Sequence, residues 1–261
     1  MKRLAKDKLQ KVYITVKRLT SSLISDNPDL TEWAKCYAEY HVDRIVDDIM
    51  LILEACEEKV GLHIADIGST PPLVPAYLAE NGHQVDALDI DPSRVRVTAE
   101  SSFTLHTTDI EDITNSRLPR RDYDIIVLTE VLEHLRINIP VTLSTLNNSL
   151  VNGGVLVLST PNLWSYRGIR SLLIDQRAEV LCSRPEVEYK KLDELGHMGH
   201  VREYTYKEVA SLLRSCGFRI KKVVFRQYQG PKTSCLEKVI TKLVPRLRNN
   251  VAILAIKDKS S

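Results

Sequence analysis

Glycine and proline are scarce in this 261-residue chain, with 10 and 11 residues respectively. Because 43% of the residues are hydrophobic and 27% are charged, the composition excludes a collagen-like, low-complexity or wholly disordered protein. Cysteine is also rare: the five residues are odd in number and widely spaced, and no two form a CxxC pair. We therefore expect free thiols in a reducing cytosol rather than a disulfide framework or a thiolate zinc site.

Long apolar runs are missing as well. No run approaches the roughly 20 residues of a membrane span, and the N-terminal residues lack the apolar stretch of a secretory signal. These features predict a cytoplasmic protein. The formal net charge is only +2, so total charge argues neither for nor against a nucleic-acid partner.

The first 60 residues are predicted to form a helical extension. Residues 1–25 hold seven basic residues against one acid, with apolar residues at helical spacing: Leu9, Val12, Val16 and Leu19. Such a helix can bind an anionic membrane surface. It can also pack on the body with its lysines in water, which is the interpretation we favour. A second, uninterrupted helix is predicted from Asn27–Pro28 to about Glu58.

Strands and helices alternate from residue 62 onward, within a predicted main domain of residues 61–261. Apolar strands are expected at 62–67, 84–89, 103–107, 123–128, 155–158, 219–225 and 251–256. Helices are expected at 75–81, 92–100, 138–151 and 206–216. The alternation predicts an α/β fold with a doubly wound, mostly parallel sheet and helices on both faces. Residues 161–204 interrupt it and are expected to form a lid, and a basic linker is expected between the last two strands.

Polar residues and a glycine follow the predicted strands at the edge where an open parallel sheet binds ligands. Asp89 ends the second strand, where a carboxylate can accept both hydrogen bonds of a ribose diol. Gly68 ends the first strand, and its missing Cβ lets the backbone approach a ligand closely. Residues 68–72 (GSTPP) hold one glycine, and their prolines remove amide donors that a pyrophosphate needs. The pattern therefore favours a nucleoside over a dinucleotide.

Five stretches follow one another in an order that resembles the class I S-adenosylmethionine-dependent methyltransferases. They are 65–68 (ADIG), 87–92 (ALDIDP), 108–112 (TDIED), 123–134 (YDIIVLTEVLEH) and 151–162 (VNGGVLVLSTPN). The resemblance covers about residues 60–226, and the tail 251–257 fits the family's last strand. It implies a Rossmann-like, seven-stranded sheet whose last strand is antiparallel. Within this family, the sequence is most similar in its motifs to the small-molecule and ubiquinone-pathway-like branch.

The same resemblance implies S-adenosylmethionine as cofactor and assigns residues to its parts. Asp66 and Gly68, with Ser69 in the same loop, would lie beside the methionine part. Asp89 would hold the ribose hydroxyls, and Ile90 would lie against the adenine. The other implied contacts are Asp109 with the adenine amino group, Ile110 beside the adenine, and Thr129 on the sulfonium side.

A small or lipid-linked acceptor methylated on oxygen is the predicted substrate. Methyl transfer requires alignment of donor and acceptor, and an oxygen acceptor also needs a general base, for which histidine is the usual residue. His200 and His134 are the candidates, with His197 in the same stretch as His200. Side chains just after the fifth strand are expected to line the acceptor pocket: Trp164, Tyr166 and Arg170.

Three alternatives stay open on the sequence. Two carboxylates and two imidazoles resemble the metal site of the small-RNA terminal 2′-O-methyltransferases and could bind a divalent ion. These residues are Glu130, Glu133, His134 and His200. We nevertheless predict that the protein holds no metal. An RNA acceptor could bind the basic ends of the chain through its phosphates. A non-catalytic nucleoside-binding protein could share the fold. The oligomeric state is not predicted.

Overall fold

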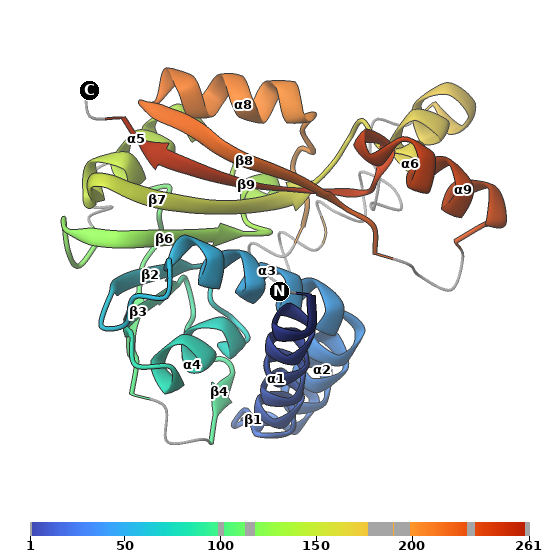
Figure 1. Ribbon diagram of the computed structural model, residues 1–261. Helices are drawn as coiled ribbons and strands as arrows, with labels where there is room; N and C mark the ends of the chain where they lie inside the picture. Colours follow the sequence, from blue (N-terminus) through green and yellow to red (C-terminus); the bar gives the residue numbers. More distant parts are fainter. Residues whose placement is uncertain are drawn as a thin grey trace.

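A computed structural model describes residues 2–98, 102–112, 118–176, 190, 199–228 and 233–258 of the protein. Within these residues, seven strands form one sheet (Figure 1). Their spatial order is β5 (Thr104–Thr107), β3 (Gln84–Asp89), β2 (His63–Ile67), β6 (Tyr123–Thr129), β7 (Leu150–Pro161), β9 (Asn250–Lys257) and β8 (Phe218–Arg226). The strands from β5 to β7 are parallel, and β9 runs antiparallel to both β7 and β8. The predicted α/β class, Rossmann-like architecture and antiparallel last strand are confirmed.

Alternate residues of the central strands pack against helices on opposite faces of the sheet. In β6, Ile125 and Val127 belong to one buried apolar cluster, and Ile126 and Leu128 belong to the other. The first cluster is covered by α1 (Lys2–Ser21), α3 (Val42–Ala55) and α4 (Leu73–Glu80), and the second by α5 (Ile139–Ser149) and α8 (Tyr206–Ser215). Burial on both sides explains why these strands are almost wholly apolar.

Of the N-terminal helices, α3 lies directly on one face of the sheet and α1 packs outside it (Figure 1). In α1 the apolar residues Val12, Val16 and Leu19 are fully buried, and the helix packs on α3 and α4, as the favoured interpretation has it. The single long helix predicted from residue 28 is wrong. The chain forms α2 (Pro28–Tyr40) and α3, which are separated at His41. The His41 ring packs against Tyr37. Because the helix breaks at His41, α3 can lie on the sheet in a direction that differs from that of α2 (Figure 1).

The helix predicted at 92–100 is also wrong for its described part. Asp91 and Pro92 form a helix-start signal, but the chain turns there and then forms the two-residue strand β4 (Arg96–Val97). This strand pairs antiparallel with β1 (Leu23–Ile24), and the neighbouring Val95 is fully buried. Tertiary pairing of β-branched residues thus overrides a local capping signal.

The other predicted elements are present, with ends shifted by a few residues. The largest shift is in β7, which extends well before and after the expected 155–158. The N-terminus of α8 is fixed by a capping box between Thr205 and Glu208. The predicted linker before β9 contains a helix, α9 (Cys235–Leu243), which Ser234 caps. The division at residue 60 stays a prediction.

The predicted lid is described only in part. Its first half contains α6 (Tyr166–Arg170) and a following π-helical turn, η2 (Ser171–Asp175). Residues 177–189 and 191–198, which include His197, lie outside the described residues. Among the helices that the structure describes, none is both long and apolar enough to cross a membrane.

Candidate active site

Two adjoining cavities lie at the carboxyl ends of β2, β3 and β6. The larger has an empty volume of about 980 Å³ and the smaller about 470 Å³. They share Gly68, Asp89 and Ile90 in their walls. The structure brings all eight predicted cofactor residues to these two cavities: Asp66, Gly68, Ser69, Asp89, Ile90, Asp109, Ile110 and Thr129. Their assignment to a cofactor is still a prediction, but their convergence at one site is observed.

Gly68 occupies a position that only glycine fits. Its φ is +70°, and a Cβ built on it would lie 2.5 Å from Val131 Cγ2. Its amide donates to Leu88 O at 2.8 Å, which fixes the loop to the neighbouring strand. The next residue, Ser69, is buried, and its Oγ has no hydrogen-bond partner among the described residues. A buried hydroxyl without a partner is costly, and this one lies in the wall of the larger cavity, where a polar ligand could satisfy it.

Backbone hydrogen bonds fix the Asp89 carboxylate at the junction of the two cavities. Oδ2 accepts from the Thr70 amide at 3.1 Å, and Oδ1 accepts from the Asp91 amide at 3.0 Å. Each oxygen has a second lone pair for a ligand. Asp109 Oδ1 accepts from the Glu111 amide at 2.9 Å in the smaller cavity. Preorganised carboxylates on adjacent strand ends suit a ribose diol and an exocyclic amine.

The wall of the larger cavity also contains the buried acids Asp48 and Asp66. Burial raises the pKa of Asp66 well above its ordinary value, and the neighbouring Asp48 and Asp89 carboxylates raise it further. A cationic ligand group placed here would favour the charged form of Asp66. The residues present therefore fit S-adenosylmethionine, which carries an ammonium group on its methionine part and a diol on its ribose.

Three polar residues from the N-terminal helices line the larger cavity and were not predicted to do so: Tyr37, Arg44 and Asp48. Arg44 Nη2 donates to the Tyr37 hydroxyl at 2.8 Å. The Arg44 Nε is buried and has no partner among the described residues. The available signal was their position beside the buried stripe of Ile45, Ile49 and Ile52, because charged residues there are rarely buried without a role.

Glu130 separates the larger cavity from another, of about 700 Å³, that is also lined by His41, Arg167 and Tyr228. Its Oε1 accepts from Ser159 Oγ and from Asn250 Nδ2, both at 2.8 Å. Burial alone would raise the pKa of Glu130, but the Arg44 guanidinium and these hydrogen bonds lower it below its ordinary value. Glu130 is therefore a fixed carboxylate in the wall between two cavities.

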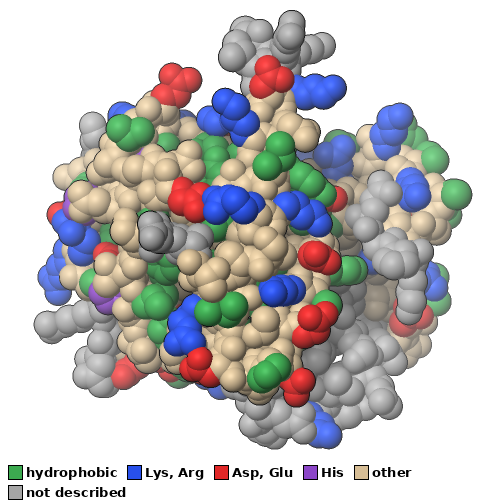
Figure 2. Space-filling model, turned by 90° about the horizontal axis from the view of Figure 1, so that it is seen from below, with side chains coloured by type: hydrophobic (Ala, Val, Ile, Leu, Met, Phe, Trp, Pro, Cys, Tyr) green, Lys and Arg blue, Asp and Glu red, His purple; other side chains and the backbone are tan. Residues whose placement is uncertain are grey.

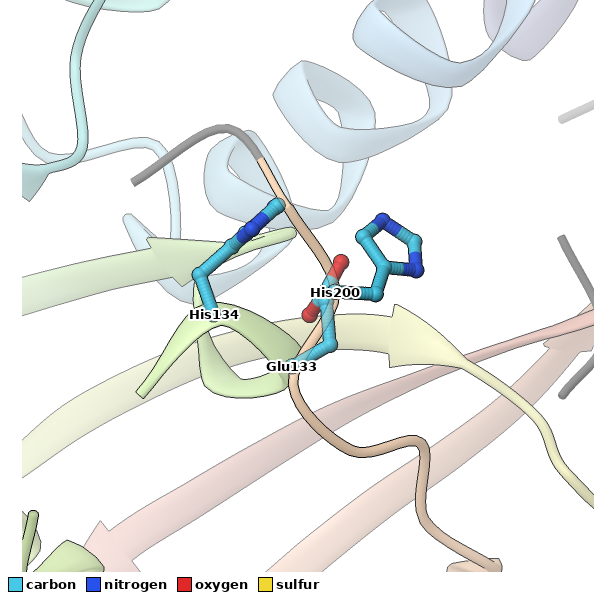
Figure 3. A group of neighbouring side chains, drawn as sticks. All are labelled: Glu133, His134 and His200. Atoms are coloured by element: carbon cyan, nitrogen blue, oxygen red, sulfur yellow. The ribbon is translucent and has the colours of Figure 1, made fainter. Parts of the chain in front are cut away.

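Figure 3 shows the side chains of Glu133, His134 and His200 close together, and His134 of this group lines the larger cavity. One ligand atom from each lies within 4.8 Å of the others. His134 Nδ1 donates to Gly199 O at 2.8 Å, and His200 Nδ1 lies 3.4 Å from Glu203 Oε1. Burial raises the pKa of Glu133 to about 8, and the Glu130 carboxylate adds to this effect.

The residues expected around an acceptor are only partly brought together. His134 lines both cavities at the strand ends, and His200 packs against it with ring centroids 4.8 Å apart. Trp164 and Arg170 are exposed, whereas Pro161 and Arg167 line the cavity beyond Glu130. Glu130 is not in the converging group, because Ser159, Asn250 and Arg44 engage its oxygens.

A family model described as a methyltransferase domain matches residues 37–223. Among curated proteins, none matches the chain.

Solved structures give the fold. An S-adenosylmethionine-dependent methyltransferase from Archaeoglobus fulgidus has 18% identity and a TM-score of 0.51, with 82% of this chain and 94% of that chain covered. Magnesium protoporphyrin IX methyltransferase from Synechocystis, with bound SAH, has 14% identity and a TM-score of 0.51, with 98% and 95% covered. A Haloferax volcanii methyltransferase in complex with its Trm112 activator has 11% identity and a TM-score of 0.54, with 90% and 100% covered.

Proposed function

Because the chain belongs to the class I S-adenosylmethionine-dependent methyltransferases, we propose that it methylates an oxygen of a small or lipid-linked molecule. Membership of a family of enzymes sets aside the non-catalytic alternative. The likeness to the ubiquinone-pathway-like branch and a cytoplasmic location are parts of the same proposal.

The cofactor is S-adenosylmethionine, which supplies a methyl group on a sulfonium. We assign its binding to residues of the two cavities at the strand ends. Asp89 would accept from the ribose hydroxyls, and Asp109 from the adenine amine. Asp66 and Arg44, of opposite charge, would face the two ends of the amino-acid part, and Ser69 Oγ would gain the partner that it lacks.

The observation that carries the oxygen acceptor is the imidazole of His200, which packs against His134 in the wall of the larger cavity. With Nδ1 donating to Glu203, Nε2 is the atom that would take the proton of an acceptor hydroxyl. Glu203 is buried and would orient the ring. The cavity beyond Glu130 would hold the acceptor, since the Arg44–Glu130 pair lines both this cavity and the cofactor cavity.

The test is incubation with labelled cofactor and cell extract, followed by the mass of the labelled product. For the acceptor so identified, His200→Ala should lower turnover about 10²- to 10⁴-fold while cofactor affinity stays unchanged. His106→Ala is the matched control, because this histidine pairs with Asp86 on the sheet. Full activity of His200→Ala would remove His200 as the base.

A metal-assisted reaction on a ribose hydroxyl of RNA is the second candidate. It is favoured by the convergence of Glu133, His134 and His200, whose nitrogen and oxygen donors suit a divalent ion. If this candidate holds, a chelator should abolish activity, and Mg²⁺ or Mn²⁺ should restore it. RNA affinity should then fall steeply with salt. Activity that survives chelation would favour the metal-free reaction.

A further inference from the structure

Helix α9 is amphipathic, but its polar side faces the protein and its apolar side faces the solvent. Its buried residues are polar, Glu237 and Thr241. Its exposed residues include Leu236, Val239 and Leu243, which recur at helical spacing on one face. A helix of a globular domain normally turns its apolar stripe to the core.

Polar contacts explain why α9 is held in this orientation. Glu237 Oε1 accepts from Arg167 Nε of α6 at 2.8 Å and from Gln227 Nε2 at 3.1 Å. Thr241 Oγ1 donates to Glu237 O at 2.8 Å. The inner face of α9 therefore forms hydrogen bonds with α6 and with Gln227, the residue that follows β8. The apolar stripe of α9 faces away from these contacts.

The neighbouring segment adds a second exposed apolar group. α6 packs against α9, and the turn after it, η2, exposes Leu172, Leu173 and Ile174. In Figure 1, α6 and α9 lie together beyond the carboxyl ends of the strands, at the right of the view. We call this pair, with η2, the α6–α9 lobe. Exposed apolar side chains gathered in this way mark an interaction surface.

Charge on the same lobe is positive. Its exposed basic residues are Arg170, Lys238 and Lys242, whereas Asp175 is an exposed acid and Glu237 is buried in its pair with Arg167. Arg246, in the turn η3 (Pro245–Leu247) that follows α9, is also exposed. Figure 2 shows green and blue side chains side by side on the lobe at the right of the view. Apolar residues mixed with lysine and arginine are the pattern of surfaces that lie in a membrane interface.

We propose that the α6–α9 lobe docks on the surface of an anionic lipid bilayer. A bilayer offers apolar chains to the leucines and phosphates to the basic residues. A second copy of the chain would instead bring two cationic patches together. Arg167 of this lobe also lines the cavity beyond Glu130. A docked enzyme could thus take a lipid-linked acceptor from the membrane, a consequence that rests on the proposed function.

The docking is tested without cofactor or acceptor, so its failure is separate from failure of the proposed reaction. The intact chain is floated with vesicles of phosphatidylcholine, with and without phosphatidylglycerol. We expect binding to the anionic vesicles that weakens as salt rises. Leu173→Ser/Leu243→Ser should reduce partitioning into the vesicles at least about tenfold, since the variant lacks two leucine side chains that would enter the bilayer. Both residues are about three-quarters exposed, at 74% and 75%, so folding should be retained and is checked by circular dichroism.

Matched control variants replace exposed apolar or basic residues outside the lobe. Val60→Ser/Ile14→Ser removes apolar residues that are 74% and 57% exposed outside the lobe, Val60 lying just before the amino end of β2 and Ile14 on α1. This variant should bind like the wild type. Lys238→Gln/Lys242→Gln should weaken binding to anionic vesicles, whereas Lys8→Gln/Lys11→Gln on α1 should not.

Three results would overturn the proposal. The first is a wild-type chain that does not float with anionic vesicles. The second is a loss of binding in the control variants that equals the loss in the lobe variants, which would place the contact on α1 or make it unspecific. The third is self-association of the wild type, measured by sedimentation, that Leu173→Ser/Leu243→Ser removes while vesicle binding persists. That result would make the lobe an interface between copies.

Discussion

Arg44 Nη1 lies 3.5 Å from Glu130 Oε2, which joins helix α3 to the end of strand β6. Both side chains are largely buried, and both line the cofactor cavity and the cavity beyond it. Glu130 has a φ of +55°, which is uncommon for a residue other than glycine, and its hydrogen bonds to Ser159 and Asn250 hold the side chain in this wall. The pair therefore connects the N-terminal helices to the site.

Removing the arginine should damage both the fold and the site. Arg44→Ala leaves the buried Glu130 carboxylate without its main counter-charge, which should cost about 3 kcal/mol of unfolding free energy. Cofactor affinity, measured by calorimetry, should also fall. Arg120→Ala removes an arginine from an exposed pair with Asp122 and should leave both quantities unchanged. Equal effects of the two variants would contradict the role given to Arg44.

Gly68→Ala should destabilise the protein and weaken cofactor binding. The new Cβ meets Val131 Cγ2 at 2.5 Å, in addition to the strain of a φ of +70°. Gly82→Ala is the matched control, because its φ is +82° and nothing lies within 4 Å of its Cβ. The control should lose about 1 kcal/mol from backbone strain alone, and Gly68→Ala should lose more in urea unfolding. If both variants lose the same unfolding free energy, the close approach of Val131 to Gly68 does not contribute to stability.

The strands and the residues at their carboxyl ends were predictable, because a buried parallel strand is a continuous apolar run and polar residues follow it where it ends. Asp89 and Gly68 follow such runs and meet in space as expected. Arg44 and Asp48 were missed, since a periodic pattern of apolar residues gives the buried face of a helix but not which charges lie at its margin. The false helix at 92–100 has a similar cause: pairing of β4 with β1 depends on residues about 70 positions apart, which no local signal reveals.

His41, at the break between α2 and α3, should make stability depend on pH. Burial, and then the Arg44 charge, lower the pKa of His41 from 6.5 to about 4. The folded state therefore prefers the neutral imidazole, and this stabilisation is present above pH 6.5 and lost as the pH falls toward 4. The difference in unfolding free energy between the wild type and His41→Gln should shrink over that range. A difference that stays constant from pH 6.5 to 4 would contradict the buried, neutral state of His41.

The central claim is that the strand ends bind S-adenosylmethionine through Asp89. Calorimetric titration of the cofactor into the wild type and Asp89→Ala tests it most directly. Asp91→Ala is the control, because it keeps the amide that donates to Asp89 and changes a neighbouring carboxylate. We expect binding to the wild type and to Asp91→Ala, and affinity at least about a hundredfold weaker in Asp89→Ala, since a carboxylate that accepts both ribose hydroxyls is lost. Unchanged affinity in Asp89→Ala would contradict it.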